Sequence, residues 1–396
     1  MKTKTFLYLI LLFIPAFIIT SCRGDENYLL WAEQEQIAPG EVGEIKGFFL
    51  LNEGNMGSNK STLDYFDYES GTYFRNIYPT VNPQVTHNLG DVGNDIQIYG
   101  DKLYAVINCS HLVEVMDVYT AEHLHTLDIT NCRYIVFDKD YAYVSSYNGP
   151  VLIDPDAPIG TVVKVDTRTM QIVDKCVVGY QPEEMVIHNN KLYVANSGGY
   201  RVPEYDTTVS VIDLETFTEI KKIEVGINLH RLELDNYGYL YVSSRGDYKK
   251  IGSKTFIIDT RTDEVVKTLG LLPNSNMELS GDSLYVYSVE WSHITQSNTV
   301  TYAIFDTKQQ KIVTRKFIKD GTEKRIKVPY GIAVNPVTKD FFTTDAKDYV
   351  SPGTLYCFKR NGVKKWSVMT GDIPAHIVFT DKRMTNLDLL SKNKIQ

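Results

Sequence analysis

Residues 208–216 read TVSVIDLET, an alternation of apolar and polar residues that reaches an aspartate with a threonine three positions later. Runs of the same kind recur along the chain, and their aspartates are Asp67, Asp117, Asp166, Asp213, Asp259 and Asp306. Successive aspartates are 50, 49, 47, 46 and 47 residues apart. A period in this range indicates a repeated supersecondary unit. Because the unit reads as strands throughout, we predict a β-propeller.

One repeat shows the predicted blade clearly. Its four strands, named A to D from the axis outward, are expected at residues 184–188, 191–196, 209–213 and 219–225. The two outer strands alternate apolar and polar positions, whereas the inner strands are more uniformly apolar, as expected for strands packed on both faces. We interpret the repeated aspartates as turn residues whose carboxylates accept backbone N–H bonds, not as a catalytic set.

The first repeat lacks an inner strand, and the end of the chain supplies one. FFLLNEGN at residues 48–55 reads as strand B with no strand A before it, while AHIVF at 375–379 matches the pattern of strand A. We therefore predict an all-β, seven-bladed propeller of four-stranded blades whose first blade is closed by a C-terminal strand. Truncation before Ile377 is expected to be severely destabilising.

The N-terminus has the pattern of a secretory signal. Lys2 and Lys4 precede an apolar stretch, residues 6–19, that is too short to span a bilayer comfortably, and small residues lead to Cys22. This resembles a bacterial lipoprotein signal in which Cys22 is acylated, and the alternative is an ordinary signal peptide with a chance cysteine. We predict an outer-membrane lipoprotein exposed at the cell surface. The expected segments are a signal peptide at 1–22, a flexible tether at 23–46, the propeller at 47–382 and a tail at 383–396.

Charge and cysteine content limit the possible partners. The net charge of −8 argues against nucleic acid, which requires a basic face. Four cysteines follow Cys22 without C-x-x-C spacing, so we predict no metal site and no cofactor. Cys109 and Cys132 are expected at the same end of neighbouring inner strands, and export would permit a disulfide between them.

One face of the propeller is predicted to carry the long connections. The A-to-B and C-to-D turns are short, as at Asn189-Asn190, whereas six of the seven B-to-C loops are long. These loops are expected at residues 53–61, 147–160, 197–207, 245–253, 289–297 and 346–353. Connections longer than the fold requires are often functional. We therefore place the candidate binding site on this long-loop face.

The residue that enters each inner strand is expected to face the mouth of the axial channel. In blade order these residues are His376, Asn94, Arg133, Glu183, His230, Asn276 and Tyr330. Around them we expect Asn52, Asn55, Asn108, Asn196 and Arg245, with Tyr147, Tyr200, Tyr248, Trp291 and Tyr349 on the loops. Aromatic rings together with amides suit a large ligand that is part apolar and part amide-bearing. The alternative is that the tyrosines only pack on one another.

Catalysis has little support in the sequence. His230, His376 and Glu183 would have to converge, but no H-x-E-H or G-x-S-x-G motif occurs. His123 and His125 are expected on an outer strand of blade 2, facing solvent. We predict a non-catalytic protein.

Several motifs resemble known propeller families. YVAN at 193–196 and VIDLET at 211–216 are similar to YncE-like, surface-layer-type propellers, which implies the fold. A narrower likeness, to the Bacteroidetes surface lipoproteins of the BtuG family, rests on NEGN at 52–55, GDV at 90–92, NCSHLVEVMDVYT at 108–120, YGIAVNP at 330–336 and DAKDY at 345–349. It implies capture of cobalamin or a related corrinoid and transfer to a TonB-dependent outer-membrane transporter. The alternatives are a glycan- or protein-binding propeller and a propeller lyase or hydrolase.

Overall fold

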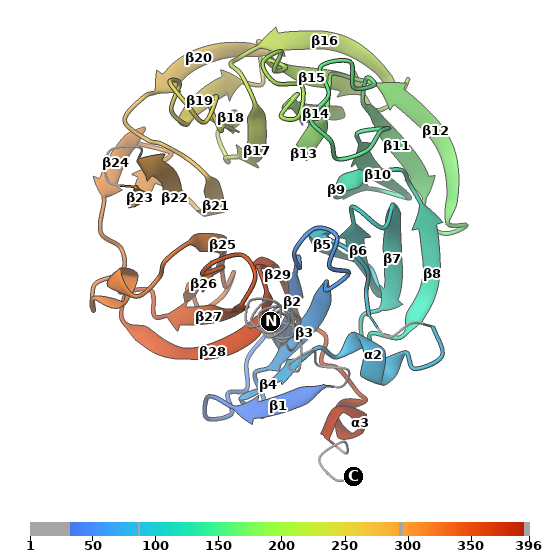
Figure 1. Ribbon diagram of the computed structural model, residues 1–396, viewed down its shortest axis with the longest axis vertical. Coiled ribbons are helices and arrows are strands. Elements are labelled where there is room, and N and C mark those ends of the chain that lie inside the picture. The colour runs from blue at the N-terminus through green and yellow to red at the C-terminus, as the bar shows by residue number, and fades with distance from the viewer. Residues whose placement is uncertain (1–31, 86–87, 293–295, 392–396) are drawn as a thin grey trace, which may run out of the picture. The chain divides into compact units, whose positions relative to one another are not determined.

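The computed structural model describes residues 32–85, 88–292 and 296–391 (Figure 1). The predicted signal peptide, Cys22 and the first part of the predicted tether lie outside these residues. Within them, none of the helices has the length and apolar character needed to cross a membrane.

Seven antiparallel sheets surround a central axis, and each sheet is one blade (Figure 1). Blade 1 contains β1 (Glu33–Gln36), β2 (Gly47–Asn52), β3 (Thr62–Asp67), β4 (Thr72–Arg75) and β29 (Pro374–Thr380). Blade 2 contains β5 (Gly93–Tyr99), β6 (Lys102–Ile107), β7 (Leu112–Asp117) and β8 (His123–Asp128). Blade 3 contains β9 (Cys132–Asp138), β10 (Tyr141–Ser146), β11 (Thr161–Asp166) and β12 (Gln171–Val177). Blade 4 contains β13 (Pro182–His188), β14 (Lys191–Asn196), β15 (Thr208–Asp213) and β16 (Thr218–Glu224).

The remaining blades repeat the same order from the axis outward. Blade 5 contains β17 (Leu229–Leu234), β18 (Tyr239–Ser244), β19 (Lys254–Asp259) and β20 (Glu264–Leu269). Blade 6 contains β21 (Asn276–Ser280), β22 (Ser283–Ser292), β23 (Ser297–Asp306) and β24 (Lys311–Thr314). Blade 7 contains β25 (Pro329–Val334), β26 (Phe341–Asp345), β27 (Pro352–Phe358) and β28 (Lys364–Asp372). The short helices are α2 (Tyr78–Val81), α3 (Leu387–Ser391) and the 3-10 turn η2 (Thr322–Lys324).

The two ends of the chain meet in blade 1, as predicted. β29 pairs antiparallel with β2 in a register that places Gly47 opposite Thr380 and Phe49 opposite Val378. The C-terminal segment therefore supplies the inner strand of the first blade. This pairing closes the ring and confirms both the seven-bladed count and the closure predicted from the sequence.

Blade 1 also has a fifth strand that we did not predict. β1 pairs with β4, with Glu33 opposite Arg75 and Gln36 opposite Thr72, so residues 33–36 belong to the sheet and not to a flexible tether. The sequence EQEQ has no apolar alternation because this strand lies at the exposed rim of the blade. On the same blade, Arg383 from the predicted tail donates to both Asp67 carboxylate oxygens at 2.8 Å.

The core lies between neighbouring blades. Tyr193, Val211, Leu232 and Val242, for example, are buried together between blades 4 and 5. Strands B and C of each blade pack on both faces, which explains their nearly continuous apolar runs. The repeated aspartates hold the outer turns as predicted: Asp213 accepts hydrogen bonds from the backbone N–H groups of residues 215 and 216 at 3.0 and 2.9 Å.

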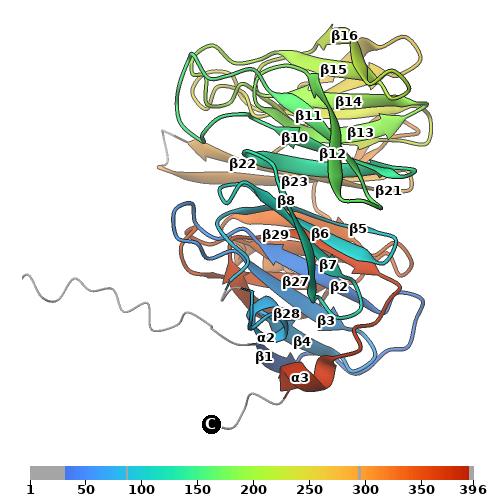
Figure 2. The ribbon, with the colours of Figure 1, turned by 90° about the vertical axis from the view of Figure 1, so that its right-hand side faces the viewer.

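One long loop expected in blade 6 is instead mostly strand. β22 and β23 form a hairpin whose pairing continues to Ser292 opposite Ser297, through most of the loop predicted at residues 289–297. Figure 2 shows this hairpin extending from its blade on one side of the ring. The pairing is possible because Val289, Glu290 and Trp291 continue the alternation of β22 beyond the length of the other B strands.

Candidate ligand-binding face

The long-loop face carries a set of exposed apolar side chains. Tyr248 is 66% exposed and Trp291 is 53% exposed. Other large apolar residues exposed on loops of this face are Met56, Leu152, Ile153, Ile251, Tyr349 and Val350. Several exposed apolar side chains on one face favour an interaction surface.

A bulge at the start of the inner strands shapes the centre of this face. In blade 3, Ile135 lies opposite Val144 and Cys132 lies opposite Ser146, so that Arg133 and Tyr134 together oppose a single residue. The same kind of shift occurs at the start of β5, β13, β17, β25 and β29. A bulge re-aims side chains. As a result, two successive residues at the start of an inner strand can approach the axis, whereas we had expected one residue per strand.

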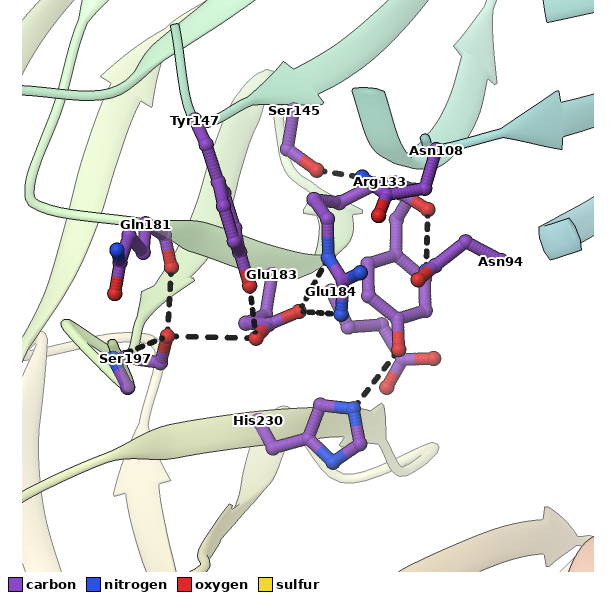
Figure 3. Close-up of polar contacts among 12 residues, drawn as sticks. Asn94, Asn108, Arg133, Ser145, Tyr147, Gln181, Glu183, Glu184, Ser197 and His230 are labelled. Atoms are coloured by element: carbon purple, nitrogen blue, oxygen red, sulfur yellow. Dashed lines mark hydrogen bonds and ion pairs between the residues drawn. The ribbon is translucent and has the colours of Figure 1, made fainter. Parts of the chain in front are cut away.

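An ion triad of Arg133, Glu183 and Arg245 lies on one side of the channel mouth, and Figure 3 shows its Arg133–Glu183 pair. Arg133 donates through Nε and Nη2 to Glu183 Oε2 at 3.1 and 3.0 Å, and Arg245 donates to Oε1 at 3.1 Å. The Tyr147 hydroxyl also donates to Oε1, at 2.6 Å. Burial opposes ionisation of Glu183, but the two guanidinium groups outweigh it and hold the pKa of this carboxyl at about 2. Glu183 is therefore an ionised partner of two arginines at neutral pH.

Tyr134 reaches across the axis of the ring. Its hydroxyl is 2.8 Å from His230 Nε2, so the side chain extends from blade 3 to blade 5. Its ring also lies 6.4 Å, between centroids, from that of His376 on blade 1. Residues of three blades thus meet at the axis, and a ligand on this face would rest above them.

The other side of the mouth contains a second polar group. The Tyr330 hydroxyl donates to Glu53 Oε2 at 2.8 Å, and His376 Nε2 lies 3.6 Å from Glu53 Oε1. Tyr330 packs edge-on against Tyr349, with ring centroids 6.0 Å apart. The amide of Asn55 donates to the backbone oxygen of Tyr349 at 2.9 Å and fixes this loop to blade 1.

Trp291 faces the same side of the mouth. Glu290, its neighbour in β22, accepts from Ser253 N and Oγ on blade 5, at 3.1 and 2.8 Å. Val289 packs on the opposite side, against Val328 of blade 7. Because side chains alternate along a strand, Trp291 shares the side of Val289 and projects above blade 7.

Most predicted asparagines hold the framework of the face. Asn52 and Asn196 are fully buried, and each donates to a threonine hydroxyl of the following strand at 3.0 Å. The other buried amides bond to backbone oxygens of neighbouring blades: Asn94 to Arg133, Asn108 to Cys132 and Asn276 to Tyr330. As placed here, these side chains stabilise the loops and inner strands and present no exposed amide to a ligand.

Below the mouth, acidic side chains join the inner strands of successive blades. Asp95 accepts from Ile135 N at 3.0 Å, and Glu184 accepts from Leu232 N at 2.6 Å. Burial raises the pKa of both carboxyl groups. Each acid thus bonds to the backbone of the next blade, which gives it a structural role in the ring.

Glu183 and His230, which catalysis would require to converge within hydrogen-bond reach, are bonded to different partners. Glu183 bonds to the triad arginines, Tyr147 and Ser197, whereas His230 bonds to Tyr134. His123 is not simply solvent-facing as expected, since its Nδ1 lies 2.6 Å from a Glu114 oxygen.

The four cysteine thiols in the described part of the chain are free. Cys109 and Cys132 do not form the disulfide that export would permit. In the described part of the chain, no group of three or more His, Cys, Asp or Glu side chains is arranged to hold a metal ion.

Sequence reasoning missed Tyr134, Arg231 and Glu53 as residues of the mouth. Tyr134 and Arg231 directly follow predicted ring residues, but strict alternation along the strand would point them away from the axis. Only the bulge brings them inward. Glu53 follows Asn52 at the end of β2, and its sequence context gives no sign that it pairs with Tyr330, which is distant in the chain.

This fold and face define a seven-bladed β-propeller whose axial mouth is surrounded by long loops. The chain belongs to the family described as a domain of unknown function, DUF5074, whose model matches residues 46–380. No curated protein matches the chain.

Similar solved structures agree on the fold. A quinonprotein alcohol dehydrogenase-like protein from Bacteroides thetaiotaomicron is 15% identical, with a TM-score of 0.57, over 86% of this chain and 79% of that one. A functionally unknown protein from Desulfotomaculum acetoxidans is 10% identical, with a TM-score of 0.57, over 85% and 99% of the two chains. Hydrazine synthase from Kuenenia stuttgartiensis is 17% identical, with a TM-score of 0.54, over 70% and 80%. At these identities the likeness concerns the fold alone.

Proposed function

We propose that this protein is a non-catalytic, surface-anchored lipoprotein that captures a bulky ligand on its long-loop face. The observation that carries the proposal is the set of exposed aromatic and aliphatic side chains on these loops, including Tyr248, Trp291 and Tyr349. Apolar rings beside a few polar groups suit ligands that are themselves part apolar. The lipid anchor at Cys22 and transfer of the ligand to a TonB-dependent outer-membrane transporter are parts of the same proposal.

A corrinoid is the ligand class that we favour. A corrinoid has a broad ring with apolar faces and a rim of amide groups, and it can rest on a closed surface without entering a channel. Tyr248 lies on the loop at residues 245–253 and Trp291 lies on β22, and both rings are exposed to a ligand on this face. Arg245 is partly exposed on the same loop as Tyr248, and its guanidinium group can donate to amide or phosphate oxygens.

The state of Glu183 supports a binding role over a catalytic one. A general base must be able to take up a proton near neutral pH. The pKa of Glu183 is held at about 2, against the effect of burial, by Arg133 and Arg245. This carboxylate is therefore suited to positioning the arginines.

A glycan- or protein-binding propeller is the second candidate. The Tyr134 hydroxyl contacts His230 across the axis, between blades 3 and 5. Side chains that meet across the axis favour a broad partner that contacts the loops over a small molecule inserted along the axis. Such a partner would use the same exposed side chains.

The direct test is calorimetric titration of the chain from Arg23 onward with cyanocobalamin. We expect one-to-one binding, weakened about tenfold or more by Trp291→Ala or Tyr248→Ala, since truncation of a central aromatic residue commonly costs at least that much. Tyr237→Ala, which removes an exposed tyrosine from an A-to-B turn on the opposite face, is the matched control and should bind like the unaltered protein. No binding, or equal loss in the control, would reject the corrinoid proposal.

A further inference from the structure

The ion triad at the mouth has an excess of positive charge. Two guanidinium groups, Arg133 and Arg245, share the single carboxylate of Glu183, which leaves one net positive charge. Within the described chain, the one side-chain hydrogen bond of Arg245 runs from Nη1 to Glu183, and the side chain is partly exposed. The guanidinium group therefore has further N–H donors on the ligand-facing side of the protein.

His230 lies beside this triad with one ring nitrogen unused. The residue is 8% exposed, and its Nε2 is bonded to the Tyr134 hydroxyl. Its Nδ1 has no hydrogen-bond partner among the residues that the structure describes. In Figure 3 one nitrogen of the His230 imidazole lies on a dashed line and the other nitrogen is directed away from that line. A buried polar atom without a protein partner indicates a place for a bound group.

The surroundings of His230 favour a negatively charged partner. Burial and the nearby guanidinium groups of Arg245, Arg231 and Arg133 hold the pKa of His230 well below its ordinary value. The imidazole is therefore neutral in a positive electrostatic potential.

Acidic groups on the neighbouring inner strands have partners of their own. Glu183 and Glu184 on β13 are paired with arginines. On β21, Glu278 has a pKa raised by burial to about 8, so it is largely protonated at neutral pH. Neither strand therefore cancels the positive potential at His230.

We propose that the mouth binds an anionic oxygen group of the ligand, a carboxylate or a phosphate, between the Arg245 guanidinium and His230 Nδ1. With Nε2 accepting from the Tyr134 hydroxyl, Nδ1 carries the proton and donates it to the anion. The inference rests on the proposed function only in placing the ligand on the long-loop face. It narrows the ligand class to molecules with a negative charge beside their apolar part.

The proposal also predicts a pH dependence. An anion at Nδ1 offsets the surrounding cations and so raises the pKa of His230 in the complex. His230 therefore binds a proton at a higher pH in the complex than in the free protein. As a result, the affinity for the anion rises as the pH falls through the pKa that His230 has in the complex.

The test uses small probes and the chain from Arg23 onward, labelled with ¹⁵N-histidine. Sulfate, acetate and neutral acetamide are titrated at constant ionic strength while the His230 ring nitrogens are followed by NMR. We expect a saturable shift with sulfate or acetate and none with acetamide. Tighter sulfate binding would indicate a phosphate-type ligand, and tighter acetate binding would indicate a carboxylate.

Variants separate the site from general charge effects. Arg245→Gln should weaken anion binding about tenfold or more, because a charge-assisted hydrogen bond is lost. Arg261→Gln removes an exposed arginine paired with Asp259 on the opposite face and should change nothing. If Arg245→Gln does not fold, His230→Gln, which removes the imidazole Nδ1 donor, should show the same loss of sulfate or acetate binding, measured by calorimetry because this variant lacks the NMR reporter.

The outcomes distinguish this inference from the proposed function. The absence of a saturable shift, or an equal shift with acetamide, overturns the anion site. Tight cyanocobalamin binding that is unchanged in Arg245→Gln also overturns it while leaving ligand capture intact. Saturable anion binding without cyanocobalamin binding keeps the site and removes the corrinoid.

Discussion

The two faces of the propeller are made by the same repeat, but their connections differ. On the short-turn face, two-residue turns such as Asn189-Asn190 and the repeated Asp-x-x-Thr turns join the strands. On the long-loop face, connections such as residues 147–160 carry the polar and aromatic groups of the mouth. The comparison shows that the repeated strands and short turns build the ring, whereas the binding proposal depends on the long loops, in which the repeats differ.

The largest expected effect comes from removing the strand that both faces require. Truncation after Ile373 deletes β29, which pairs with β2 and closes blade 1. We expect loss of the cooperative thermal transition, followed by circular dichroism, because the edge of β2 is left unpaired and blade 1 loses the strand that packs between its neighbours. Truncation after Ser391 keeps β29 and is the control. A cooperative transition in the shorter chain would show that closure is dispensable.

The next largest effect is on stability at low pH, and it concerns the ion triad on the long-loop face. Burial opposes ionisation of Glu183, yet the triad arginines lower its pKa from 4.5 to about 2. Its contribution to stability, about 3 kcal/mol, is present above the unfolded-state pKa and is lost as the pH falls through the folded-state pKa. The stability difference between the unaltered protein and Glu183→Gln, measured by urea unfolding, should therefore shrink between about pH 4.5 and pH 2. A difference that does not depend on pH would contradict the triad.

The smallest effect is expected on the short-turn face. Asp213→Ala removes the acceptor of two backbone N–H groups and of the Thr216 hydroxyl in an exposed turn. We expect a slight fall in the melting temperature and unchanged ligand affinity, because the turn is on the face opposite the proposed site. An altered affinity would mean that the short-turn face also takes part in binding.

The sequence predicts the ring well because its signals are local and repeated. The aspartate turns, the B strands and the missing inner strand of the first repeat all follow from patterns within one blade. β1 was missed because the exposed rim strand EQEQ has no apolar alternation. The free thiols of Cys109 and Cys132 likewise could not be inferred from their similar positions in neighbouring strands.

The mouth was predicted less completely because it depends on geometry that the sequence does not signal. Arg133, Glu183 and His230 do meet there, but the bulges that also bring in Tyr134 and Arg231 leave no periodic trace. For the buried asparagines the prediction included too many residues. Asn52 and Asn196 were expected to bind the ligand, but their amides hold neighbouring strands together.

Hydrogen exchange measured with and without cyanocobalamin tests the central claim most directly, because it reports on both faces at once. Our account predicts slower exchange in the loops that carry Tyr248 and Tyr349 and in the β22–β23 hairpin, with no change in the turns of the short-turn face. Protection confined to the short-turn face, or no protection anywhere at saturating cyanocobalamin, would contradict it.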